Sequence, residues 1–382
     1  MINSIETPKK HIRFFPGDPI VIVTVMLLVF IGIVMVFSSS YYVLLSENQS
    51  PFSLLRKQAI AAAVGLVGMF VAARLPYYKV YNMKTSVLAY FVACTLVVIA
   101  SFIPGSHGAN RWIPLFGGFS IQPSEVAKIA MVLICSCYLA ADDRRAYVFS
   151  KGFFGWAIIL IIPFMLIWQM TNNFSSALTV AIIAFAIFFV ATPHWKMISA
   201  MGLFGGAAMF LYLMIGGDWR GGRIAAWLDP WADPGGDGFQ IIQSLYSVSS
   251  GGLFGLGLGN SRQKLKYMPE PQNDCIFAVI CEETGFVGAA IVLTLFAILI
   301  WRGVIIAMNA SDKKGCYIAS GITAMIAAQV IINVAVVTNT IPVTGIPMPF
   351  ISYGGTSLSF TMILIGILLN VSSFAKNEKG GI

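Results

Sequence analysis

Long apolar runs joined by short polar connections constrain this chain more than any other feature of its sequence. A helix needs about twenty mostly apolar residues to cross the hydrocarbon core of a bilayer. Runs near that length cover residues 19–39, 60–73, 87–102, 126–141, 153–168, 177–191, 197–215, 276–301, 317–337 and 358–371. They predict an all-α polytopic membrane protein with about ten transmembrane helices. Nine or eleven spans stay open, because several runs are short and the polar patch 169–176 could interrupt one longer run.

The composition supports lipid as the main solvent of this chain. Hydrophobic residues make up 58% and charged residues 10% of the 382 residues, and the mean hydropathy is +0.82. A soluble domain carries about 25% charged residues, so the sequence predicts one membrane domain and no separate soluble domain. The six cysteines and three histidines show no zinc-ligand spacing. We therefore expect no dedicated metal site.

The distribution of basic residues predicts how the chain is oriented. Lys and Arg favour short cytoplasmic loops. With the N-terminus inside, most Lys and Arg residues fall on the cytoplasmic side, and the short outer loops hold only Arg56, Lys57 and Arg111. We therefore predict that both termini are cytoplasmic. The net charge of +8 then belongs mainly to a belt that faces anionic lipid, which argues against nucleic acid as a partner.

Three predicted connections are unusual. The outer segments 104–123 and 216–273 are long, and long loops in compact proteins are usually functional. Segment 342–355 holds three prolines and three glycines. Irregular backbone at membrane depth is tolerated where it is buried in protein or lines a wet cavity, so this segment is a candidate cavity wall. An ordinary turn between the last two helices is the alternative.

Ionisable residues within spans are the main indication of function, because they are costly in lipid. Glu125 and Lys128 stand three apart and can pair on one helix face. Glu282 and Glu283 lie two to three turns into the eighth span. All four could border one cavity. An ion-pair network that locks the fourth and eighth spans together is the structural alternative.

Asp274 lies at the outer mouth of the eighth span, where water meets the membrane. A role as helix N-cap is the alternative to a functional role. The outer loops add Arg111 and Trp112 in one segment, and Arg220, Arg223, Arg262, Lys264 and Lys266 in the other. Several cations beside one acid suit a phosphate-bearing substrate, although each cation alone could simply be solvated.

The glycine-rich stretch 251–259, GGLFGLGLG, resembles a phosphate-binding loop. It lacks the lysine and the preceding strand of a P-loop. Its backbone amides could bind an anion, but a flexible turn or close helix packing is the favoured interpretation.

Five motifs together resemble one known family. They are GANRWI at 108–113, IQPSEVAK at 121–128, GLGNS at 257–261, YMPEP at 267–271 followed by DCIFAVICEE at 274–283, and PFISYGGT at 349–356. Their order and spacing resemble the SEDS family (shape, elongation, division and sporulation), the group that contains FtsW, RodA and SpoVE. The stretches around Gln243 and Arg262 resemble the FtsW/SpoVE branch more than RodA.

The resemblance implies a peptidoglycan glycosyltransferase that polymerises lipid II at the outer face of the bacterial cytoplasmic membrane, for division or sporulation. It implies residues 1–17 as a cytoplasmic tail, 18–373 as the transmembrane domain with an outer loop at about 216–273 between helices seven and eight, and 374–382 as a second cytoplasmic tail. It also implies a class B penicillin-binding protein as transpeptidase partner, with other divisome proteins. A divalent cation, Mg²⁺ or Mn²⁺, is a possible cofactor.

The resemblance further implies that Asp274 is the general base. The candidate substrate-binding residues are Arg111, Trp112, Glu125, Lys128, Arg220, Arg223, Lys264, Lys266, Glu282, Ser352 and Thr356. The chain departs from the family at 172–176, where NNFSS replaces the usual PDFGT. The usual acid is therefore an amide, which puts a charge or metal role at that position in doubt. A lipid II flippase and a non-catalytic divisome scaffold are the rival interpretations.

Overall fold

The computed structural model describes residues 17–103, 110–114, 120–147, 150–215, 219–236, 238–262 and 271–375, without the side chains of 204 and 207–221. Within these residues, nine helices are long and apolar enough to span a membrane. They are α1 (Pro19–Ser46), α2 (Ser53–Arg74), α4 (Met83–Ser101), α5 (Pro123–Ala140), α6 with the π-helical turn η4 (Lys151–Met165 and Leu166–Met170), α7 (Phe174–Ala191), α11 (Ile276–Met308), α12 (Lys313–Val337) and α13 (Gly355–Ser373). Helix α8 (Trp195–Ile215) has similar length. The predicted polytopic helical fold is confirmed.

The predicted break near residues 169–176 separates two helices. Helix α6 ends in the π-helical turn η4, and α7 begins at Phe174. Asn173 caps α7, because its side chain accepts a hydrogen bond from the backbone N–H of Ser176 at 3.1 Å. Asn172 takes a positive φ of 49°. Local capping chemistry therefore divides the 153–191 run into two spans.

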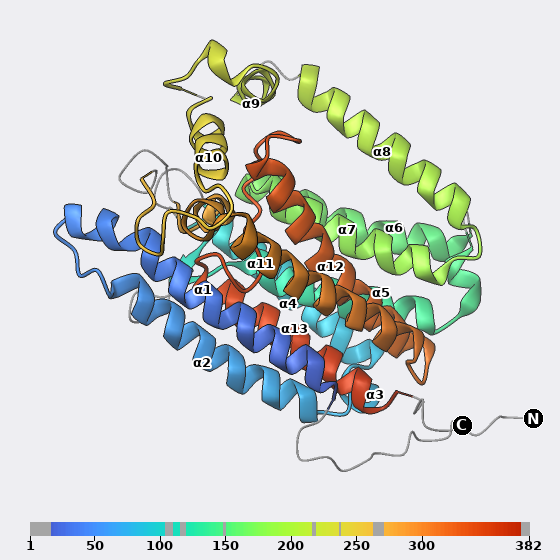
Figure 1. Ribbon diagram of the computed structural model, residues 1–382. Helices are drawn as coiled ribbons and strands as arrows, with labels where there is room; N and C mark the ends of the chain where they lie inside the picture. Colours follow the sequence, from blue (N-terminus) through green and yellow to red (C-terminus); the bar gives the residue numbers. More distant parts are fainter. Residues whose placement is uncertain are drawn as a thin grey trace, which may run out of the picture.

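The remaining elements are short and lie between the spans. They are α3 (Tyr77–Val80), the antiparallel pair β1 (Ile113–Pro114) and β2 (Ser120–Ile121), η3 (Asp143–Ala146), α9 (Trp219–Leu228), η5 (Pro230–Ala232) and α10 (Phe239–Ser250). The long connection after α8 is thus partly helical. In Figure 1, α9 and α10 lie at one end of the bundle and α3 lies at the other.

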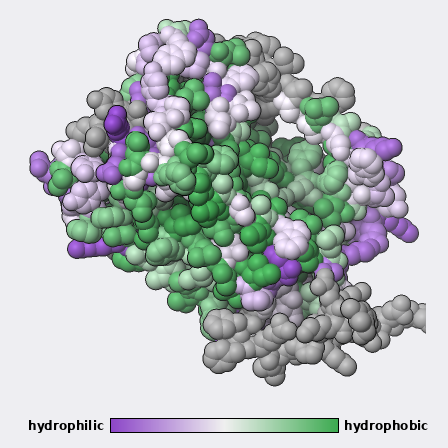
Figure 2. All heavy atoms as spheres, viewed as in Figure 1, coloured by the Kyte–Doolittle hydropathy of each residue, from purple (hydrophilic) through white to green (hydrophobic). Residues whose placement is uncertain are grey.

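Helix α5 lies at the centre of the bundle. Of its apolar window, 78% of the residues are buried, against 28% for α2 and for α4. It packs against α4, α7 and α12, while α13 packs against α2 and α11 packs against α1 and α12. Figure 2 shows a broad apolar band between more hydrophilic ends, as expected for helices that face lipid.

Helix α8 stands apart from the other spans. It runs along the edge of the bundle in Figure 1, and its main contacts are with α7 and α9, its neighbours in sequence. Figure 2 shows a hollow lined by hydrophobic residues between this edge and the body of the bundle. The space beside α8 is where the cavity described below lies.

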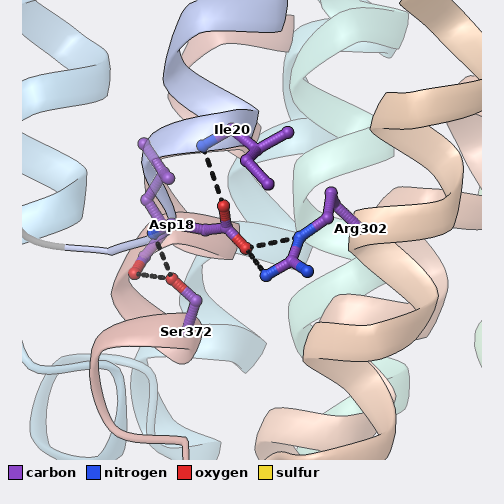
Figure 3. Close-up of polar contacts among 5 residues, drawn as sticks. Asp18, Ile20, Arg302 and Ser372 are labelled. Atoms are coloured by element: carbon purple, nitrogen blue, oxygen red, sulfur yellow. Dashed lines mark hydrogen bonds and ion pairs between the residues drawn. The ribbon is translucent and has the colours of Figure 1, made fainter.

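A polar cluster joins the beginning of α1 to the ends of α11 and α13 (Figure 3). The Asp18 carboxylate accepts a hydrogen bond from Ile20 N at 2.9 Å and caps α1. The same carboxylate pairs with Arg302, whose Nε donates at 2.8 Å. The backbone N–H of Asp18 donates to Ser372 Oγ at 3.0 Å. The beginning of the first span and the end of the last span therefore lie on one side of the bundle, as the predicted ten crossings require. The cytoplasmic orientation of that side stays a prediction.

We predict that Asp18→Ala lowers the free energy of unfolding by at least about 2 kcal/mol, because it removes a helix cap and leaves a partly buried guanidinium without its carboxylate. The apparent Tm of the purified protein in detergent measures this. Asp143→Ala is the matched control, since the Asp143–Lys313 pair is exposed on both sides and such pairs contribute about 0–1 kcal/mol. Equal Tm values for the two variants would contradict the prediction.

Candidate functional site

One cavity of about 1630 Å³ runs along the inner side of α7 and α8. The part of the cavity that the sequence predicts to be its outer part is lined by six of the sequence-predicted residues, namely Arg111, Trp112, Glu125, Lys128, Arg223 and Asp274. Its deeper part is lined mainly by apolar side chains of α6, α7, α8, α11 and α12, among them Phe185, Ile198, Val304 and Met308. A polar head and a long apolar tail would therefore both fit the same cavity.

Asp274 reaches this cavity from the start of α11. The N-cap residue of α11 is Cys275, so the alternative that Asp274 caps the helix is wrong. The backbone carbonyl of Asp274 accepts a hydrogen bond from Asn333 Nδ2 at 2.9 Å. The carbonyl of the preceding Asn273 accepts one from Ser352 Oγ at 2.8 Å. Groups from α12 and from the following connection thus fix the backbone on both sides of the carboxylate.

The irregular connection between α12 and α13 forms one wall of the cavity, as predicted. Its residues 340–347, 353 and 354 line the space. At Gly345, φ is +69°, and an added Cβ would lie 3.1 Å from Asp274 Oδ2. Glycine therefore suits both the backbone conformation and the close approach of the carboxylate. The amide of Asn333 also holds this wall, donating to the carbonyl of Ile346 at 2.8 Å.

Glu125 and Lys128 form an ion pair on the cavity wall. The Lys128 Nζ to Glu125 Oε1 distance is 2.6 Å, and the two side chains are 3% and 4% exposed. Pro123 opens α5 at its first turn, which also contains Glu125, and a carboxylate there is stabilised by the helix dipole. Both residues belong to α5, so this ion pair does not link the fourth and eighth spans, as the structural alternative had it.

Three predicted binding residues do not line the cavity. Glu282 accepts hydrogen bonds from Ser261 Oγ and Arg262 N, at 2.5 and 2.8 Å. Ser352 donates to the carbonyl of Asn273 and accepts from Met348 N at 2.8 Å. Thr356 starts the last helix, outside the cavity lining. Their direct contact with a substrate stays a prediction that this geometry does not favour.

Three predicted cations cannot be placed. Lys264 and Lys266 lie within 263–270, outside the described residues, and the side chain of Arg220 is likewise outside the description. Arg223, on the next turn of α9, does line the cavity. Nearby, Trp227 Nε1 donates to the carbonyl of Asn339 at 3.1 Å, and Asn339 Nδ2 donates to the carbonyl of Trp227 at 3.3 Å. This reciprocal contact holds α9 at the end of α12.

Several uncharged polar residues of the cavity were not predicted from the sequence. They are Gln122, Asn172, Gln240, Gln329 and Tyr353. Burial raises the pKa of Tyr353 above its ordinary value, so its phenol stays neutral and able to donate at physiological pH. Neutral hydrogen-bonding groups suit sugar hydroxyls and amides. Because these residues carry no charge, the sequence criterion of ionisable residues within spans does not identify them. Gln122 and Tyr353 do lie within the motifs at 121–128 and 349–356.

The amide at 173 replaces the family's acid without losing the local structure. Asn173 Oδ1 caps α7, as a carboxylate oxygen at this position would also do. The substitution therefore keeps the cap and removes one negative charge beside the cavity. Among the described residues, no group of three His, Cys, Asp or Glu side chains could hold a metal ion.

A family model described as a cell cycle protein, and named for FtsW, RodA and SpoVE, matches residues 18–377. Stage V sporulation protein E of Bacillus subtilis is 39% identical, with 94% of this chain and 98% of that protein covered. A probable peptidoglycan glycosyltransferase FtsW of Trichlorobacter lovleyi is 37% identical, with 97% of each chain covered.

Solved structures agree with these sequence relatives. A chain from a peptidoglycan synthase complex that coordinates polymerization and crosslinking has a TM-score of 0.74 and 26% identity, with 93% of this chain and 97% of that chain covered. The rod shape determining protein RodA of Thermus thermophilus has a TM-score of 0.69 and 23% identity, with 96% and 99% covered. The second likeness concerns the fold alone.

We predict that Lys128→Met lowers the free energy of unfolding by about 3–5 kcal/mol, because it leaves the Glu125 carboxylate buried without a partner. Combining it with Glu125→Gln should recover at least half of that loss. Thermal unfolding in detergent measures both variants, with Lys313→Met as the exposed control. A double variant as unstable as the single one would argue against the ion pair.

Proposed function

This chain belongs to the FtsW/RodA/SpoVE family of cell cycle proteins, and on that premise we propose that it is a peptidoglycan glycosyltransferase that polymerises lipid II into glycan strands. The proposed site is the outer part of the cavity, at the outer face of the bacterial cytoplasmic membrane. The observation that carries the proposal is that Asp274, two guanidinium groups and an apolar channel at membrane depth share one cavity.

The substrate's chemistry matches this division of the cavity. Lipid II joins a disaccharide peptide to a long isoprenoid through a pyrophosphate. The cations Arg111 and Arg223 line the outer part, where they can neutralise the phosphates by charge-assisted hydrogen bonds. The apolar side chains below them can take part of the isoprenoid. The neutral polar side chains can contact the sugars.

The proposed reaction is a direct displacement at the donor's anomeric carbon. The Asp274 carboxylate takes the proton of the acceptor's 4-hydroxyl as the oxygen attacks that carbon. A new glycosidic bond forms, and the bond from the anomeric carbon to the pyrophosphate oxygen breaks. Polyprenyl pyrophosphate leaves with the bonding electron pair, and the proton passes from Asp274 to solvent. Arg111 and Arg223 stabilise the charge that develops on the leaving group.

We propose that a divalent cation, Mg²⁺ or Mn²⁺, would bind only together with the substrate's pyrophosphate. The donor set in the cavity is poor for a resident metal, because Glu125 is paired with Lys128 and Asp274 is the other carboxylate in the lining. Asp274 and the substrate's own phosphates would hold such an ion. It would supply further charge neutralisation at the leaving group.

We propose a class B penicillin-binding protein as the partner, together with other divisome proteins. The support is the structural likeness to a chain from a complex that couples polymerization to crosslinking. The sequence relatives named for sporulation and for FtsW favour a role in division or sporulation over elongation.

A detergent assay separates this function from its rivals. A flippase needs two sides of a membrane, and a scaffold needs no reaction, whereas a polymerase makes glycan from lipid II in micelles. We expect polymer from the purified protein with its co-purified partner. Absence of polymer from an active partner complex would favour transport or scaffolding.

We predict that Asp274→Asn lowers the polymerisation rate by at least about 10²-fold, the contribution expected of a general base, while the protein still inserts and folds. Gel analysis of glycan strands made from labelled lipid II measures the rate. Asp229→Asn, in the exposed turn that opens η5, is the matched control. Polymerisation at the wild-type rate by Asp274→Asn would show that the base is another group.

We predict that Arg223→Ala raises the KM for lipid II more than it changes insertion or folding, because a cation facing the phosphates is lost. An increase of about tenfold corresponds to about 1.4 kcal/mol of binding energy. Arg56→Ala, an exposed outer residue that does not line the cavity, should leave KM unchanged. Unchanged kinetics in both variants would remove Arg223 from the site.

A further inference from the structure

Helix α11 is interrupted by a kink at Gly285. There φ is +67° and ψ is −167°, which is not helical. Gly285 lies nine residues into the helix, about 14 Å below its start at 1.5 Å per residue. The kink divides α11 into a short outer helix, residues 276–284, and a longer inner span. Asp274 stands two residues before that outer helix.

The kink leaves backbone groups open at membrane depth, and the glycine-rich loop 251–259 satisfies them. Leu256 N and Gly257 N donate to the carbonyls of Glu282 and Glu283, at 2.9 and 3.0 Å. In return, the amides of residues 286 and 287 donate to loop carbonyls at 2.9 and 3.1 Å. Unsatisfied backbone groups in hydrocarbon each cost several kcal/mol. The loop is therefore part of the structure of α11.

The loop can approach this closely because it is made of glycine. At Gly255, with φ of +78°, an added Cβ would lie 2.2 Å from the carbonyl oxygen of Glu283. At Gly285, it would lie 2.4 Å from the backbone nitrogen of Gly255. Close packing, which the sequence favoured, is thus the role of this stretch. Its amides at 255–257 donate to backbone carbonyls and are not open to a phosphate.

Two buried glutamates reinforce the same junction. Glu282 and Glu283 are each 1% exposed. Glu282 accepts hydrogen bonds from Ser261 Oγ and Arg262 N, just after the loop, at 2.5 and 2.8 Å. Ser38 Oγ, from α1, lies 2.7 and 2.6 Å from the two carboxylate oxygens of Glu283. One carboxylate thus ties the outer helix to the loop, and the other ties it to the first span.

We propose that Glu282 is a positioning residue for Asp274. The inference rests on the proposed function, in which Asp274 is the base. A short helix separated from the rest of α11 by a kink has no rigid connection to the bundle through its own backbone. Its tethers to the loop and to α1 fix its inner end, while Asn333 and Ser352 hold the backbone at residues 273 and 274. Both sets of contacts are therefore needed to set the place of Asp274. Glu282 acts through this helix and does not touch the substrate.

The cost of such carboxylates supports a role in position. An acid within a span is expensive and persists where its partners are fixed. The two carboxylate oxygens of Glu282 accept hydrogen bonds from Ser261 and Arg262, and the side chain lies outside the cavity lining. A displacement of the outer helix by about 1 Å would move the base relative to the acceptor hydroxyl. Misplacement on that scale can cost about 10²-fold in rate.

The test compares Glu282→Ala, Glu282→Gln and Ser261→Ala with Ser249→Ala, an exposed serine of α10, as control. The full-length protein with its partner is assayed on lipid II for kcat, KM and the pH profile of kcat/KM. We expect Glu282→Ala to lower kcat by about 10²-fold, with KM little changed and the acidic limb of the pH profile shifted. Glu282→Gln keeps an acceptor for the loop and should retain most activity. Ser261→Ala should fall between them.

Amide hydrogen exchange supplies a readout that needs no activity. The amides of Leu256 and Gly257 should exchange faster in Glu282→Ala than in wild-type protein or in Ser249→Ala. If Glu282→Ala does not fold, Ser261→Ala carries the same test, because it removes one tether and a small volume.

Several results would overturn the inference. A wild-type kcat in Glu282→Ala and Ser261→Ala would do so, and so would a fall in activity that the loss of folded protein accounts for in full. A raised KM with unchanged kcat would instead make Glu282 a binding residue. If wild-type protein makes no polymer, the proposed function fails; if Asp274→Asn polymerises normally, the base is another group. In either case faster exchange would show only a structural tether.

Discussion

The structure depends on one constraint: polar groups placed among apolar helices must find partners inside the protein, because lipid offers none. Each buried charge described here meets that condition. Glu125 pairs with Lys128, Glu282 and Glu283 bind serines, and Asp18 binds Arg302. The contacts of Glu283 with Ser38 and of Asp18 with Arg302 join elements far apart in the sequence, so satisfying these polar groups also helps to assemble the bundle.

The same constraint shapes the site. The wall between α12 and α13 cannot be helical, since prolines and glycines occupy it, so its backbone groups turn inward. Asn333 and Ser352 satisfy carbonyls of this wall and of the segment before α11. Asp274 emerges where these two irregular segments meet. The backbone that carries the Asp274 carboxylate is thereby held by a neutral amide and a hydroxyl.

Sequence reasoning succeeded where the physical signal is local. Hydropathy located the spans, and the three-residue spacing of Glu125 and Lys128 predicted their contact. It failed where the partner is distant and uncharged. Glu282 binds Ser261 and the backbone amide of Arg262, which lie about twenty residues earlier in the chain. Glu283 binds Ser38, which lies in the first span. Glu282 and Ser352 stay predicted binding residues that the geometry does not favour, because motif membership does not show whether a side chain faces the cavity or another part of the protein.

The proposed function requires that lipid II binds with its head at Asp274 and its tail along α7 and α8. An experimental structure of the Asp274→Asn variant with bound lipid II tests it most directly. We expect pyrophosphate density between Arg111 and Arg223, a sugar hydroxyl facing residue 274, and isoprenoid density in the apolar part of the cavity. Lipid II density on another face of the bundle, with this cavity filled by protein side chains or bulk lipid, would contradict it.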